Sequence, residues 1–170
     1  MHHHAYLWTG PKPRFDQEAL RRPPPPEPPP AGARPELVQR YREVAAEFPA
    51  SDLPPLETAY WLVKARSLVR GTWHDPRSAA AWLGERLAAY TPRFASPCDP
   101  GALVASAHHR LAAGDDVSLG FYLERPAYLC LALVTCAPNR QHPAFPCPTA
   151  APPVPPPPPP PPAQPAAPVR

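Results

Sequence analysis

The sequence predicts an α+β fold, with about four helices packed on a C-terminal antiparallel β-hairpin. Val117 to Glu124 alternates between apolar and polar residues, and Ala127 to Cys136 is almost wholly apolar. These patterns are typical of a half-buried strand followed by a strand covered on both faces. Asp75 and Asp99 each precede a proline, as at helix starts. An all-α small bundle is the alternative, because Ala and Leu in the second run also suit a helix.

The hairpin has one register that separates its two faces. Placing Leu119 opposite Leu131 puts the large apolar residues of both strands on one face, and a slip of one residue would put leucines on both. A two-stranded hairpin alone is marginally stable in water. We therefore expect helices or a second copy of the chain to cover the leucine face, which makes self-association through the hairpin a further expectation.

Four segments carry the signals of helices, at about 36–48, 55–70, 76–90 and 100–113. The first has one apolar stripe and is expected to pack along one side. The second begins after Pro54-Pro55 and is apolar nearly all round, which is typical of a helix central in the core. The third and fourth begin at Asp-Pro pairs, where the aspartate caps the first N–H groups.

Proline divides the chain into a domain and two arms. There are 34 prolines among 170 residues, and most lie outside the middle. We expect a disordered proline-rich arm at 1–34, a single small globular domain at 35–148 and a disordered polyproline tail at 149–170. Within the first arm, the histidines at positions 2–4 are interpreted as a chance cluster or a remnant of cloning rather than as a copper or nickel chelate.

The best candidate metal ligands are Cys136, His142 and Cys147, with Cys98 or His74 as a fourth ligand. Thiolates and imidazoles in a tetrahedral set of four are what zinc prefers. The spacing includes no C-x-x-C pair, so incidental cysteines are the competing interpretation. A disulfide between the first and last of these residues is disfavoured in a reducing compartment.

Two proline motifs point to a protein partner. One consists of Arg22, Pro25 and Pro28, and the other, in the reverse orientation, of Pro165, Pro168 and Arg170. A basic residue beside P-x-x-P docks in aromatic-lined grooves, because the polyproline helix is already formed before binding. The competing interpretation is a solvated spacer.

Other classes of function are less well supported. The formal net charge of +3 and the scattered arginines give no nucleic-acid interface. No apolar run reaches the 20 or so residues that span a bilayer, so no membrane partner is expected. Phosphate-loop, nucleophile-elbow and H-E-x-x-H motifs are absent from the sequence.

The function predicted from the sequence is therefore that of a cytoplasmic, non-enzymatic interaction or accessory module whose proline-rich arms tether or space it. The alternative is a small metal-dependent or thiol enzyme that uses Cys136, His142 and Cys147.

Overall fold

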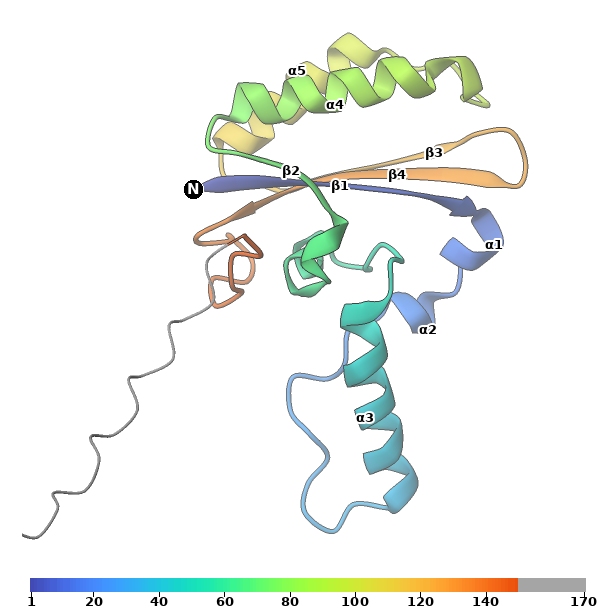
Figure 1. Cartoon of the computed structure of the whole chain (residues 1–170), viewed down its shortest axis with the longest axis vertical. Helices are drawn as coiled ribbons and strands as arrows, with labels where there is room; N and C mark the ends of the chain where they lie inside the picture. Colours follow the sequence, from blue (N-terminus) through green and yellow to red (C-terminus); the bar gives the residue numbers. More distant parts are fainter. Residues whose placement is uncertain (150–170) are drawn as a thin grey trace, which may run out of the picture.

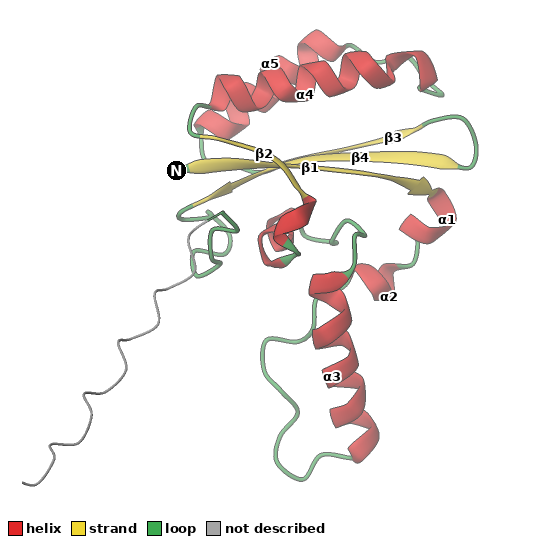
Figure 2. Cartoon of the chain, in the orientation of Figure 1, coloured by secondary structure: helices red, strands yellow, loops and turns green. Residues whose placement is uncertain are grey.

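A four-stranded antiparallel sheet divides the molecule into two sides (Figure 1, Figure 2). The computed structural model describes residues 1–149. The strand order is β2-β1-β4-β3, and the strands are β1 His2–Pro11, β2 Val69–Trp73, β3 Val117–Tyr122 and β4 Ala127–Cys136. The predicted mixture of helix and sheet is confirmed, but the hairpin supplies only half of the sheet.

The hairpin β3–β4 pairs in the predicted register. Leu119 lies opposite Leu131, and Val117 lies opposite Leu133. Because residues that face each other across a pair of strands share a face, the leucines of β4 collect on one side of the sheet. Leu131 and Leu133 are fully buried there.

The prediction of a disordered arm at 1–34 is wrong for its first part, since β1 lies between β2 and β4. It pairs with β4 along its whole length, from His2 opposite Cys136 to Pro11 opposite Ala127. The physical reason is that β4 is buried, and its second edge would otherwise leave N–H and C=O groups without partners. Short helices α1 Lys12–Phe15 and α2 Glu18–Arg21 follow, before a mostly exposed proline loop.

Two helices cover the leucine face of the sheet, α4 Pro76–Tyr90 and α5 Pro100–Ala112 (Figure 1). Both begin where predicted: Asp75 accepts from the N–H groups of Arg77 and Ser78, and Asp99 accepts from that of Ala102. A short 3-10 turn, η3 Thr91–Arg93, follows α4. Since α4 and α5 cover the leucines within one chain, this face is not open to a second copy, and the expected self-association through it loses its basis.

The second predicted helix, at 55–70, is not formed, so the prediction of about four helices on the hairpin was wrong in that detail. The segment instead contains two 3-10 helices, η1 Thr58–Val63 and η2 Arg66–Leu68, and then enters β2. β2 pairs with β1 from Trp73 to Val69. Pairing with this edge of β1 gives the backbone of β1 partners on both sides, and this tertiary requirement draws the end of the predicted helix, from Val69, into the sheet.

Helix α3, Pro35–Ala50, forms as predicted but extends away from the sheet (Figure 1). Phe48 is its buried residue, and Leu37 near its start is 49% exposed. Its apolar stripe therefore packs near its last turn and is open to solvent near its first. Its end is held by buried Lys64, whose Nζ donates to the carbonyl oxygens of Phe48 and Ser51 at 2.8 and 3.1 Å.

Candidate metal centre

Four side chains with metal-binding atoms meet at one end of the sheet, opposite the face covered by α4 and α5. The alternation of β1 puts His2 and His4 on the same face, and the register sets Cys136 of β4 directly opposite His2. Cys147 reaches them from the segment after β4. The nitrogen and sulfur donors all lie within 4.8 Å of one another, and we call this set the four-donor cluster: His2, His4, Cys136 and Cys147.

The chain turns back after β4 because of a buried asparagine. Asn139 is 1% exposed, and its Nδ2 donates to the carbonyl oxygen of Thr135 at 2.7 Å. Its Oδ1 accepts from the N–H groups of Gln141 and His142 at 3.0 Å each. A side chain that bonds to nearby backbone in this way stabilises a turn. The turn brings the following residues beside the sheet, where Cys147 lies next to His2 and His4.

The sulfur–nitrogen separations in the cluster are close to those of a tetrahedral zinc site. Sulfur and nitrogen ligands at about 2.3 and 2.0 Å from zinc lie about 3.5 Å from each other in a tetrahedron. Cys136 Sγ is 3.0 Å from His4 Nε2 and 3.8 Å from His2 Nδ1. Cys147 Sγ is 3.5 and 3.4 Å from the same two nitrogens. Four of the six edges thus lie near tetrahedral values, and the sulfur–sulfur and nitrogen–nitrogen separations are within 4.8 Å.

Burial sets the protonation states that a metal ion would meet. Burial, with a smaller contribution from the neighbouring His2 and His3, lowers the pKa of His4 to about 4, so the imidazole is neutral near pH 7. Burial, together with Cys147, raises the pKa of Cys136 to about 12. Neutral imidazole can bind a metal directly, whereas a thiol must first lose its proton.

Neighbouring side chains orient the two histidines. The Nε2 atom of His4 faces the cluster, while its Nδ1 lies 2.9 Å from Thr72 Oγ1 on β2. Metal-binding histidines commonly hold the second ring nitrogen in such a hydrogen bond, which fixes the tautomer. The ring of His2 rests edge-on against that of His74, with centroids 4.5 Å apart. His74 thus borders the site.

The structure brings together two of the three predicted metal ligands, Cys136 and Cys147. The prediction of His142 as the third ligand is corrected, because this residue lies outside the cluster. His142 Nε2 instead lies 3.0 Å from Glu57 Oε2, and its ring stacks on Phe145 with centroids 4.5 Å apart. It ties the segment after β4 to η1 rather than to an ion. Cys98, one proposed fourth ligand, is also outside the cluster that the described residues form.

Sequence reasoning missed His2 and His4 because the histidine run was interpreted as a chance cluster. The signal was the H-x-H spacing followed by Ala5-Tyr6-Leu7-Trp8, which together read as a strand with two histidines on one face. Two histidines at positions i and i+2 of a strand can bind one ion, but only the pairing with β4 shows which cysteine joins them.

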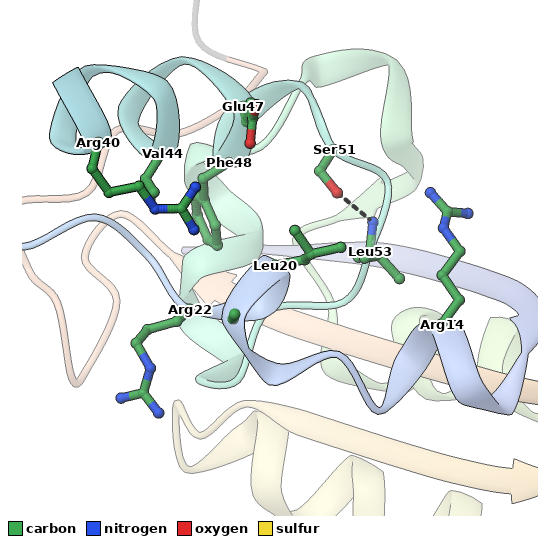
Figure 3. A pocket seen from close by; sticks show the side chains of 10 residues that line it. Arg14, Leu20, Arg22, Arg40, Val44, Glu47, Phe48, Ser51 and Leu53 are labelled. Atoms are coloured by element: carbon green, nitrogen blue, oxygen red, sulfur yellow. Dashed lines mark hydrogen bonds between the residues drawn. The ribbon is translucent and has the colours of Figure 1, made fainter. Parts of the chain in front are cut away.

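The proline motif of Arg22, Pro25 and Pro28 is exposed on the loop between α2 and α3. Arg22 also borders a hollow of about 130 Å³ between these helices, shown in Figure 3. Leu20, Val44 and Phe48 form its apolar wall. The second motif, Pro165, Pro168 and Arg170, lies outside the described residues, as does nearly all of the tail expected at 149–170.

No family model, curated protein or solved structure matches this chain. No helix within residues 1–149 has the length and apolar character that a bilayer crossing needs.

Proposed function

We propose that this protein is a zinc-binding protein whose ion is held by the four-donor cluster. The observation that carries the proposal is the match between the four sulfur–nitrogen separations, 3.0 to 3.8 Å, and the edges of a tetrahedral site. Two thiolates would neutralise the charge of the ion, and two neutral imidazoles would complete its shell.

The role that the donor set favours is structural. A catalytic zinc site keeps one position for water or substrate, whereas a site with four protein ligands is closed. Here the ligands come from β1, the end of β4 and the segment after β4. A bound ion would therefore join the N-terminal strand β1 to the end of β4 and the segment after it, which lie more than 130 residues further along the chain. This argues against the metal-dependent enzyme that was the alternative.

A thiol enzyme with Cys136 as its nucleophile is also disfavoured. Reactive cysteines have a lowered pKa and a partly exposed sulfur. Burial raises the pKa of Cys136 to about 12, and its side chain is fully buried. Without a metal ion, this sulfur would be a protonated thiol at neutral pH.

The test is metal analysis of the full chain purified without chelator. We expect stoichiometric zinc, and cobalt in its place should give the visible absorption of a tetrahedral thiolate site. Cys136→Ser should lose the metal, while Cys98→Ser, which alters a cysteine outside the cluster, should keep it. Calorimetry should detect proton release on binding, because a thiol must ionise.

Protein that is free of metal after such a purification, and that neither takes up added zinc nor gains stability from it, would contradict the proposal. Equal zinc loss in Cys136→Ser and Cys98→Ser would also contradict it, since only the first residue is a ligand.

A second function, docking to an aromatic-groove domain, is favoured by the exposure of Arg22, Pro25 and Pro28. This is the interaction or accessory role expected from the sequence. We expect a panel of immobilised proline-binding domains to retain the full chain and to lose it on Arg22→Ala or Pro25→Ala. Deletion of 150–170 tests the second motif separately. Retention that survives all of these changes would contradict this role.

A further inference from the structure

We propose that Cys136 and Cys147 form an oxidation site: a hydroperoxide converts the two zinc thiolates to a disulfide and releases the zinc ion. This inference rests on the proposed zinc binding and assigns a regulation to the same site. The chemical class of the co-reactant is a two-electron peroxide oxidant.

The two sulfurs are close enough to join. They belong to a donor set whose atoms all lie within 4.8 Å of one another, and a disulfide bond is about 2.05 Å long. Cys136 ends β4, where pairing with β1 holds its backbone. Cys147 is in the segment after β4, outside the regular strands and helices. The second sulfur can thus approach the first by movement of an irregular segment, without breaking the sheet.

The two sulfurs differ in their access to solvent. Cys136 is fully buried, whereas Cys147 is partly exposed. The peroxide therefore meets Cys147 first, and Cys136 is placed behind it as the resolving thiolate. Reversible thiol oxidation commonly pairs an accessible cysteine with a resolving one in this way.

The step balances in atoms and electrons. The Cys147 thiolate attacks one peroxide oxygen, the O–O bond breaks, and a sulfenic acid and hydroxide form. The Cys136 thiolate then attacks that sulfur, and the S–O bond breaks to release a second hydroxide. Two protons from solvent convert both hydroxides to water. The two sulfurs lose two electrons in total, and the two peroxide oxygens gain them.

Loss of the metal follows from the change in ligands. The disulfide has given up both negative charges of the site, and His2 and His4 alone leave zinc with half of its protein ligands. The disulfide still ties the segment after β4 to β4 itself. Only the link that the zinc ion made to His2 and His4 of β1 is lost, so a thiol reductant and added zinc can restore the starting state.

Cys98 and Cys130 provide matched controls within the chain. Cys98 is partly exposed, like Cys147, but is outside the four-donor cluster. Cys130 is buried on β4, six positions before Cys136 on the same face. Neither can join the disulfide without leaving its place.

The experiment treats the zinc-loaded full chain with hydrogen peroxide. A chromogenic chelator reports released zinc, and mass spectrometry after alkylation identifies the linked cysteines. We expect zinc release to follow formation of the Cys136–Cys147 disulfide, with both reversed by dithiothreitol and zinc. Cys98→Ser should release zinc within about twofold of the wild-type rate, because Cys98 is not a ligand.

Retention of zinc at peroxide levels that oxidise Cys98 would overturn the inference. So would zinc release that leaves Cys136 and Cys147 unlinked, or a disulfide that forms through Cys98 instead. All three of these results are obtained on protein that binds zinc, so they leave the proposed function standing. Protein that never binds zinc defeats the proposed function itself.

Discussion

The two faces of the sheet are held in different ways. On the face covered by α4 and α5, one continuous apolar cluster joins the sheet to both helices through residues such as Leu83, Leu111 and Leu131. On the opposite face, the apolar residues divide into two smaller clusters, around Tyr6 with Trp61 and around Trp8. Short helices and the loops between them cover that face (Figure 2).

Buried polar atoms without a hydrogen-bond partner in the described residues occur on both sides of the sheet. His3 Nε2, on the face of β1 that packs against α4 and α5, and Arg86 Nε on α4 are two of them. The Tyr6 hydroxyl and the Trp8 ring nitrogen are two others, on the opposite face, where Lys64 is also buried. Buried polar atoms of this kind lower stability unless they are paired. One face is thus stabilised by a single large apolar cluster, whereas the other has two smaller clusters and would gain most from the zinc ion proposed at the four-donor cluster.

Removal of zinc should have the largest effect and should act on one face. We expect chelation to lower the free energy of unfolding by on the order of 5 kcal/mol, since metal-binding free energy becomes folding free energy. Hydrogen exchange followed by mass spectrometry should show loss of protection in 137–149 and at the start of β1. Helices α4 and α5 should stay protected below the global transition. A uniform loss of protection would contradict the division into two faces.

Truncation in the leucine cluster should come next. Leu131 is fully buried on the face of α4 and α5, and Leu131→Ala should cost about 3 kcal/mol in urea unfolding. Because this residue does not share a face with the four-donor cluster, its cost should be the same with and without zinc, to within about 0.5 kcal/mol. A cost that changes more than this on chelation would show that the faces are coupled.

The buried lysine should give a pH-dependent effect of intermediate size. Burial lowers the pKa of Lys64 to about 8, although its Nζ donates to two carbonyl oxygens. The unfolded chain keeps a pKa near 10.5, so between these values the unfolded state binds more protons. The free-energy cost of burying the protonated lysine is therefore absent above about pH 10.5 and complete below about pH 8.

From pH 8 to 10 the wild type should therefore gain about 2 kcal/mol of stability relative to Lys64→Met, measured by urea unfolding at each pH. The variant is the control, since the other titrating groups are common to both proteins. Parallel curves for the two proteins would mean that Lys64 is not desolvated.

The smallest effect should come from a helix cap. The Asp99 carboxylate accepts from the N–H group of Ala102 at 3.1 Å. Asp99→Ala should lower the free energy of unfolding by about 1 kcal/mol, while Asp99→Asn, which can still cap, should be nearly neutral. Thermal unfolding of both variants distinguishes the loss of the cap from the loss of a negative charge. Equal destabilisation by the two changes would assign the effect to charge.

The elements that could be predicted from the sequence lie largely on the side of the sheet covered by α4 and α5. The Asp-Pro starts of α4 and α5 and the two strands of the hairpin, with their register, follow from local rules. Capping is decided within about three residues, and the pairing of Leu119 with Leu131 is the register that keeps the leucines on one side. Of the candidate site, the two cysteines were identified, because their chemistry is visible in the residue type.

The second face could not be predicted, because its decisive contacts join residues far apart in the chain. Nothing near His2 or His4 indicates that they lie beside Cys136, which is more than 130 positions away. The same holds for β2, which begins inside the segment predicted as helix and pairs with β1, a strand more than 60 positions away. The sequence by itself determined where helices begin and which strand face is apolar, and the tertiary pairing of β1 with β4 decided the donor set.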